Sequence, residues 1–364
     1  MDPKHKRLAD FVRELNRRDG RGPADFPIAD THLEPRHGNL ERFVLSSRQE
    51  APSANSLKPA EAPTSPSVAH APVLTPEAAE TFAKTLDNQE LSAGDIVRLE
   101  SIILPALRPA FDIQNETYAQ LPGDWDLLNR QRTAIEPILR AVGRLQLIGH
   151  PSYTLVGTAF VCGPNTIVTN RHVAQIFVQG LENGQQLTYL PGVTCAMDML
   201  AEVGSDASTK LNITRPVSVS SKWDIAVLHI ESLPPNIQPL PLASSSPAAI
   251  EGGVATIVGY PSYDSYESFV DQANIFRAVF DRKRLQPGKL NGRVDVPSLG
   301  QSVNAIAHDC STLGGNSGSV LVSVETAEVV GIHFSGVTHL SNYAVPSWEL
   351  VNDPALRGQG IAFV

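Results

Sequence analysis

The sequence predicts a mostly β domain that begins near Arg144 and continues to the C-terminus. Short apolar and β-branched runs recur there, separated by glycine, proline, asparagine and serine: RLQLIG, TLVGTAFVCG, NTIVTN, DIAVLHI, VATIVGY, SVLVSV and EVVGIHF. Many short strands with turn residues between them are typical of an all-β sandwich or barrel. A proline-rich stretch at residues 233–247 divides the region into parts of comparable size. We therefore expect two small barrels joined by a connector.

The chain ahead of this domain predicts an extension of mixed character. A basic amphipathic helix is expected at residues 4–18, although a helix this short is marginal without a partner. A run rich in proline and alanine follows, and its composition cannot bury enough apolar surface to offset the entropy of ordering. Apolar residues at helical spacing then predict a small helical element. The expected boundaries are 1–50 for the tail, 51–85 for the linker, 86–142 for the helical element and 143–364 for the β domain, with its barrels at about 143–232 and 245–364.

The net charge and the distribution of apolar residues argue against two classes of binding partner, nucleic acids and membranes. The formal net charge of −9 at pH 7 and the pI near 5.6 argue against nucleic-acid binding, which depends on lysine and arginine. The basic run at residues 282–284 (Arg282, Lys283, Arg284) is interpreted as a solvated loop. No signal peptide is evident, and no segment approaches the roughly 18 apolar residues that a membrane helix needs. We expect a cytoplasmic protein that binds neither nucleic acid nor membrane.

The cysteines agree with a reducing compartment. Cys162, Cys195 and Cys310 are too few and too scattered for a disulfide framework. They show no spacing typical of metal ligands, so no metal site is predicted.

A serine between glycines is the first candidate for chemistry. Ser317 lies in LGGNSGS, where glycine permits the tight backbone that aims neighbouring N–H groups at one point. The N–H groups of Gly315 and Ser317 are therefore candidates for an oxyanion hole. The motif alone is weak evidence, because glycine-serine turns are common.

A serine nucleophile needs a base, and the base needs a carboxylate that orients it. His172 follows the predicted strand of NTIVTN at the start of a short helix, a position where a lone histidine is more often structural. Asp224 opens the apolar strand DIAVLHI, where a charged side chain needs a partner. The three residues occur in the order His, Asp, Ser, which makes the set far more specific than any member.

The motifs TNRHVA, WDIAVL and GGNSGS resemble those of trypsin-like serine proteases, and most closely those of the bacterial glutamyl endopeptidases. The resemblance covers the chain from about Arg144 to the C-terminus. It implies an all-β fold of two six-stranded antiparallel β-barrels, here preceded by a partly disordered, partly helical extension. It also implies a serine endopeptidase that cleaves protein or peptide substrates with His172, Asp224 and Ser317 as its triad, and that needs no cofactor.

The resemblance also places a primary pocket, which would bind the substrate residue before the scissile bond (P1). Ser311 stands where trypsin has the aspartate that selects basic residues, so trypsin-like specificity is not expected. Thr312 and His333 correspond to pocket residues of the glutamyl endopeptidases. Together with the hydroxyl of Ser311, they favour an acidic P1 residue, Glu above Asp, and Ser335 is a further candidate for substrate binding. Two other readings stay open: His333 is a satisfied interior histidine, or the pocket suits another small or polar residue.

Asn316 replaces the aspartate that pairs with a new N-terminus when digestive zymogens are activated, so that switch is not expected. The extension is expected to regulate the enzyme or to bind a protein partner through residues 1–140. The main alternative is a latent or catalytically silent peptide-binding module of the same fold. A protease of the HtrA type would carry a peptide-binding domain, for which little chain follows Ser317. An α/β-hydrolase esterase would have the order Ser, acid, His.

Overall fold

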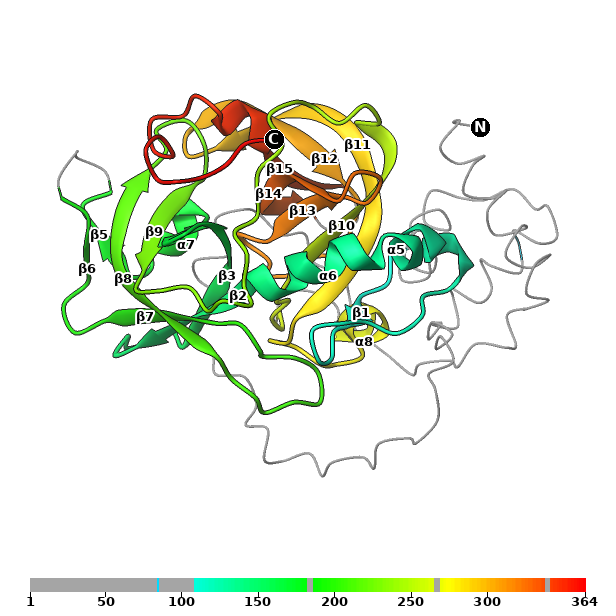
Figure 1. Cartoon of the computed structure of the whole chain (residues 1–364), viewed down its shortest axis with the longest axis horizontal. Helices are drawn as coiled ribbons and strands as arrows, with labels where there is room; N and C mark the ends of the chain where they lie inside the picture. Colours follow the sequence, from blue (N-terminus) through cyan, green and yellow to red (C-terminus); the bar gives the residue numbers. More distant parts are fainter. Residues whose placement is uncertain (1–83, 85–107, 182–185, 265–268, 338–340) are drawn as a thin grey trace. The chain divides into compact units, whose positions relative to one another are not determined.

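The computed structural model describes residue 84 and the ranges 108–181, 186–264, 269–337 and 341–364 (Figure 1). The predicted helix at residues 4–18 and nearly all of the predicted linker lie outside these residues. The chain forms two units, Met1–Leu107 with Ser265–Ala278, and Arg108–Asp264 with Val279–Val364. The described part of the first unit contains helix α8 (Phe269–Phe276). All other elements named below belong to the second unit.

The second unit begins with a short strand, a 3-10 helix and two α-helices. The elements are β1 (Phe111–Asp112), η4 (Gly123–Trp125), α5 (Asp126–Arg130) and α6 (Arg132–Ala141). Helix α6 buries Ile135, Ile138 and Leu139 on one side, as their spacing of three and four residues predicts. Strand β2 follows directly, so this helical lead-in is continuous with the β region.

Barrel 1 is a closed barrel of six antiparallel strands in the order β2-β3-β4-β9-β8-β7. Its strands are β2 (Val142–Ile148), β3 (Leu155–Gly163), β4 (Thr166–Thr169), β7 (Thr194–Asp198), β8 (Lys210–Val219) and β9 (Ala226–Ile230). Between β4 and β7 the chain forms helix α7 (Arg171–Ala174) and the small sheet of β5 (Val178–Gln179) and β6 (Thr188–Tyr189). Every residue of β4 is buried, and the strand pairs with β3 on one side and β9 on the other.

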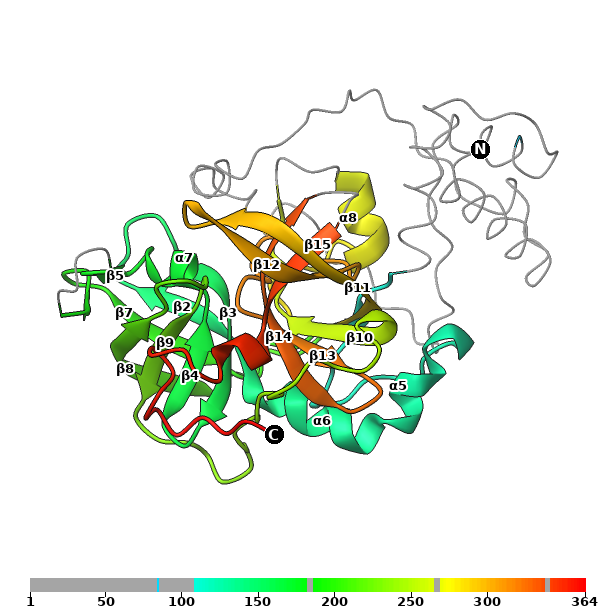
Figure 2. The same ribbon diagram turned by 90° about the horizontal axis from the view of Figure 1, so that it is seen from above.

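The second sheet has seven strands in the order β1-β11-β10-β13-β14-β15-β12. Its further strands are β10 (Glu251–Gly259), β11 (Arg284–Ser298), β12 (Gln301–His308), β13 (Val320–Ser323), β14 (Glu328–Val337) and β15 (Ser341–Pro346), after which η5 (Ser347–Leu350) follows. Strand β12, at one end of the sheet, pairs with β11 as well as with β15, which links the strands from β10 to β15 into a ring and leaves β1 outside it. We call β10 to β15 barrel 2. Figure 2 shows its yellow-to-red strands beside the green strands of barrel 1. The predicted mostly β fold is confirmed.

The prediction of a solvated basic loop is wrong for Lys283 and Arg284, because both are fully buried. Lys283 Nζ donates to the carbonyls of Leu139 and Met199, each at 2.7 Å, and Arg284 forms an ion pair with Asp112. A buried cation is tolerated when such acceptors surround it. Burial lowers the pKa of Lys283 to about 8. The three consecutive basic residues could not predict this burial from the sequence, because the groups that pair with them lie in distant segments of the chain.

Two classes of feature are missing from the described ranges. None of the helices there has the length and apolar character needed to cross a bilayer. The same residues contain no group of three or more His, Cys, Asp or Glu side chains that could hold a metal ion. The three cysteines are free and buried.

Candidate active site

The structure brings His172 and Asp224 into direct contact. Strand β4 pairs with β9 through Thr169 and Ala226, so the residues that flank these strands meet at one end of barrel 1. His172 Nδ1 lies 2.5 Å from Asp224 Oδ2, and the His172 backbone N–H donates to Asp224 Oδ1 at 2.9 Å. Because an ionised carboxylate only accepts hydrogen bonds, the ring proton lies on Nδ1 and Nε2 is left as a base.

The backbone at Asp224 is held by hydrogen bonds to buried polar side chains. The side chain of Asn170 donates to the Asp224 carbonyl at 2.9 Å. The neighbouring Trp223 N–H donates to Ser220 Oγ at 2.9 Å, and this hydroxyl donates to Asp353 at 2.6 Å. Asp224 is only 4% exposed. The carboxylate is therefore fixed by its backbone, and it can hold the imidazole in one orientation.

Ser317 lies in the loop between β12 and β13, against barrel 1. Its carbonyl accepts a hydrogen bond from Thr158 N at 2.9 Å, and the next residue, Gly318, donates to the His333 carbonyl at 2.9 Å. A Cβ at Gly318 would lie 2.1 Å from the Thr158 carbonyl oxygen, and φ there is +89°. Only glycine allows this close approach. In this conformation the Ser317 hydroxyl makes no hydrogen bond to a described residue.

The carbonyls of the two peptide groups that precede Gly315 and Ser317 both accept backbone hydrogen bonds. The Gly314 carbonyl accepts from Ser262 N at 2.6 Å, and the Asn316 carbonyl accepts from Ser319 N at 2.9 Å. In a trans peptide the next N–H points away from the carbonyl. The N–H groups of Gly315 and Ser317 are thus turned away from these contacts, and neither donates to a carbonyl of the described backbone.

Asn316, between those two donors, is held by a buried amide pair. Gln286 Nε2 donates to Asn316 Oδ1 at 3.0 Å, and Asn316 Nδ2 donates to Gln286 Oε1 at 3.2 Å. Both side chains are fully buried. Thr158 Oγ1 adds a hydrogen bond of 2.7 Å to the Gly315 carbonyl. The loop is therefore anchored by neutral groups, without a charge at the position of Asn316.

The predicted pocket residues Ser311 and Thr312 already have partners. Ser311 Oγ donates to the Arg108 carbonyl at 2.6 Å. Thr312 Oγ1 donates to Asn342 Oδ1 at 2.7 Å, and Asn342 Nδ2 donates to the Cys310 carbonyl at 2.7 Å. Ser335, on β14, is partly buried and pairs in register with Tyr343 of β15.

His333 lies inside barrel 2 and contacts a second histidine. Its Nδ1 is 3.3 Å from Nε2 of His308 on β12, and the rings meet edge to face. Burial, and secondly the nearby His172, lower the pKa of His333 to about 3. Burial, and secondly His333, hold the pKa of His308 well below its usual range. Both imidazoles are therefore neutral near pH 7, and His333 can act as a donor rather than as a cation.

Sequence reasoning missed several residues of this region: Arg108, Thr158, Gln286, His308 and Asn342. His308 directly follows the apolar residues 305–307 of β12, and this run could have indicated that the histidine is buried too. The others give no such signal, because their partners lie far away along the chain.

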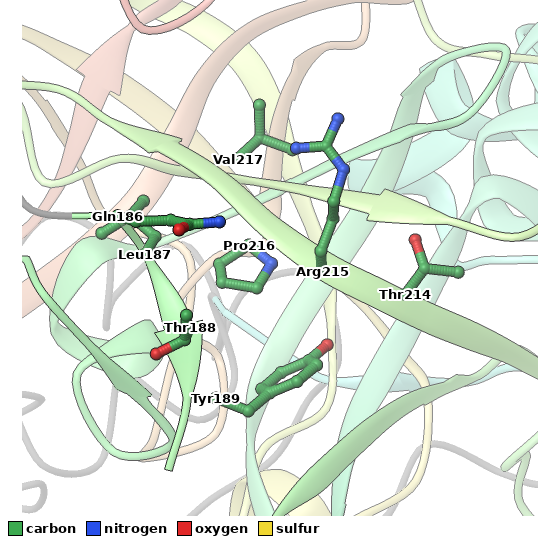
Figure 3. A pocket seen from close by; sticks show the side chains of 8 residues that line it. All are labelled: Gln186, Leu187, Thr188, Tyr189, Thr214, Arg215, Pro216 and Val217. Atoms are coloured by element: carbon green, nitrogen blue, oxygen red, sulfur yellow. The ribbon is translucent and has the colours of Figure 1, made fainter.

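A separate pocket lies on barrel 1, between β6 and β8 (Figure 3). Its volume is about 420 Å³. Arg215, in its wall, contacts His229 Nδ1 at 3.0 Å, and Tyr189 donates to the Ile213 carbonyl at 2.8 Å. None of the predicted site residues lines it.

Comparison with known proteins identifies relatives of the β region. A family model described as a trypsin-like peptidase domain matches residues 157–332. A probable serine protease of Lysobacter enzymogenes is 30% identical over 294 residues, which are 70% of this chain and 74% of the relative. Among solved structures, Deg5 is similar with a TM-score of 0.46 and 20% identity, over 68% of this chain and 100% of its own. The active form of the Rv3671c protease from M. tuberculosis gives a TM-score of 0.45 and 17% identity, over 69% and 96%.

Proposed function

Because the chain belongs to the trypsin-like serine proteases, which act on proteins or peptides, we propose that it is an endopeptidase with His172, Asp224 and Ser317 as its triad. The observation that carries the proposal is the 2.5 Å contact between His172 Nδ1 and the buried Asp224 carboxylate. This contact leaves Nε2 as a base on the side away from Asp224. The Ser317 loop, anchored on Thr158 of barrel 1, supplies the nucleophile.

In the proposed reaction His172 Nε2 takes the proton of Ser317 as Oγ attacks the peptide carbonyl, and then gives that proton to the leaving amine. Asp224 stabilises the imidazolium and keeps its orientation. Water hydrolyses the acyl-enzyme by the same steps in reverse roles. In the ligand-free state the serine and its base need not be hydrogen-bonded, because such contacts often tighten only when substrate binds.

We assign the oxyanion hole to the N–H groups of Gly315 and Ser317. Two hydrogen bonds turn the carbonyls of Gly314 and Asn316 away from the site. The two N–H donors are therefore oriented before substrate binds, which is the condition for stabilising a developing oxyanion. One such donor lowers the barrier by roughly 3–4 kcal/mol.

For the pocket we propose a preference for glutamate at P1. A neutral His333 with Nδ1 against His308 has its other ring nitrogen available to donate to a carboxylate. Thr312 can turn its hydroxyl from Asn342 toward the same group, and Ser335 on β14 adds a further hydroxyl. This pocket would bind an acidic side chain through neutral donors, without a lysine or arginine inside it.

We also propose that residues 1–107 regulate the protease or bind a protein partner, since a Pro-rich run at residues 51–85 separates the predicted N-terminal helix from the protease domain. Removing residues 1–89 tests this role. Unchanged activity, stability and binding partners after the deletion would refute it.

The central test is cleavage of a diverse peptide library by the purified chain, with Ser317→Ala as control. Two matched peptides that differ only in P1 Glu or Gln then measure the preference for charge, because the two side chains have the same shape. We expect cleavage after Glu that Ser317→Ala abolishes. Cleavage after another residue would refute the pocket assignment alone, whereas absence of cleavage by both forms would favour the silent peptide-binding module.

A further inference from the structure

The short segment 108–112 lies along barrel 2, next to the loop that carries the predicted pocket residues. Strand β1 extends the sheet by pairing Phe111 with Leu285 and Asp112 with Arg284 of β11. The ion pair between Arg284 and Asp112 anchors this strand through side chains as well. The segment is therefore an integral part of the sheet, although it lies about 30 residues before the first strand of barrel 1.

Arg108 contacts the pocket loop twice. Its backbone carbonyl accepts the hydrogen bond from Ser311 Oγ at 2.6 Å. Its guanidinium Nη2 lies 2.9 Å from Asp309 Oδ2, with side-chain exposures of 25% and 15%. The segment thus holds both ends of the stretch 309–311, one through its backbone and the other through charge.

The Asp309 carboxylate places a negative charge next to the pocket loop, and Arg108 pairs with this charge. Its other oxygen, Oδ1, accepts the backbone N–H of Lys289 at 2.6 Å, so the carboxylate is fixed beside the pocket loop. It directly follows His308, which contacts His333. An unpaired negative charge here would repel an acidic substrate side chain, and partly buried charges are only weakly screened by salt.

We propose that Arg108 is a specificity-determining residue of the primary pocket. Its guanidinium neutralises Asp309, and its carbonyl orients Ser311, so that the pocket accepts a substrate carboxylate. This inference rests on the proposed preference for P1 glutamate. It assigns a part of the substrate site to the segment that precedes both barrels, where no motif of the β domain is present.

A purely structural role for Arg108 makes a different prediction. If the segment only stabilises the loop, its loss will impair cleavage of Glu and Gln peptides to the same extent. An electrostatic role changes the ratio of the two kcat/KM values, since only the Glu peptide carries the charge. Substitution of Arg108 leaves a net negative charge at this ion pair, and substitution of Asp309 leaves a net positive one. The two changes therefore distinguish an electrostatic role from a purely structural role.

The experiment measures kcat/KM for the matched Glu and Gln peptides with the full chain and four variants. Arg108→Met, which keeps most of the side-chain volume, is expected to lower the Glu/Gln ratio about tenfold through the uncovered Asp309 charge. The double variant Arg108→Met with Asp309→Asn should recover most of the ratio. Asp309→Asn alone should raise the ratio, and Arg108→Lys should preserve it.

An unchanged ratio in both Arg108→Met and Asp309→Asn would overturn the proposal, as would an equal loss on both peptides that the double variant does not reverse. If Arg108→Met fails to fold, Asp309→Asn and Arg108→Lys still decide the question. A parent enzyme that cleaves both peptides equally well refutes the glutamate preference and this inference together. A parent that prefers Glu while the variants keep the same ratio refutes this inference alone.

Discussion

The two barrels hold their parts of the site by different means. Barrel 1 buries apolar residues together with hydroxyls, amides and carboxylates, but within the described ranges it buries no lysine, arginine or histidine. Barrel 2 and the residue before it contain all such buried groups: Lys283, Arg284, His308 and His333. Barrel 1 therefore positions its base through buried hydroxyl, amide and carboxylate groups, whereas barrel 2 also buries basic side chains, two of which, His308 and His333, lie at the predicted pocket.

This difference determines which substitutions each barrel tolerates. Removing one partner of a buried hydrogen bond leaves the other unsatisfied, at a cost of about 1–3 kcal/mol. Barrel 2 is accordingly sensitive to changes that preserve shape but remove a donor or acceptor. In barrel 1 the same sensitivity is expected at Asp224 and at its buried neighbours Asn170 and Ser220, which also share hydrogen bonds.

The largest effect is expected from Asp224→Asn, which changes the contact between Asp224 and His172 that the proposed reaction uses. The amide would donate to His172 Nδ1 and force the ring proton onto Nε2, where it blocks the base. We expect kcat to fall roughly 10⁴-fold with little change in KM. Steady-state kinetics on the preferred peptide measures both.

Asp198→Asn is the matched control, since it makes the same chemical change at another buried carboxylate of barrel 1. It breaks the ion pair with Arg144 and is expected to change stability but not kcat. Activity of Asp224→Asn within about tenfold of the parent would contradict the triad assignment.

A smaller loss is expected from Gln286→Leu in barrel 2. The substitution keeps the approximate size of the side chain but removes the two hydrogen bonds that Gln286 makes with the buried Asn316 amide, so the proposed oxyanion loop loses one of its anchors. We expect kcat to fall about 100-fold, comparable to the loss of one oxyanion donor. Thr256→Val removes another buried polar group of barrel 2, on β10, and should leave kcat unchanged. An equal fall in both variants would indicate general destabilisation instead.

The residues that sequence analysis identified share a local signal. His172, Asp224 and Ser317 each lie beside a recognisable strand in a distinctive motif, and the β runs themselves predicted the fold. Gln286 and Arg108 have no local signal, because their roles come from partners that only the folded sheet brings close. Lys283 is a case in which the local sequence gave the wrong prediction. Its basic neighbours suggested solvent exposure, whereas its hydrogen-bond acceptors come from α6 and from the segment after β7.

The smallest expected effect is the contribution of Lys283 to the pH dependence of the free energy of unfolding. Burial lowers the pKa of Lys283 in the folded state to about 8, from an ordinary value of 10.5. Between these two pH values the unfolded chain therefore binds more protons than the folded one. Stability conferred by this group must then rise with pH. Relative to Lys283→Met, the parent should gain about 2 kcal/mol of unfolding free energy between about pH 8 and pH 9.5.

The comparison must be made as a difference between the two proteins. Burial also raises the pKa of all three cysteines, and their ionisation in the unfolded chain lowers the stability of both proteins as the pH rises above about 8.5. Urea titrations of the parent, Lys283→Met and the exposed control Lys210→Met measure the difference. If the parent and Lys283→Met differ by the same amount at both pH values, Lys283 has an ordinary pKa and barrel 2 does not hold a destabilised cation. A difference that grows with pH, absent for Lys210→Met, would show that barrel 2 buries a cation at a cost in stability, a cost that barrel 1 avoids by burying none.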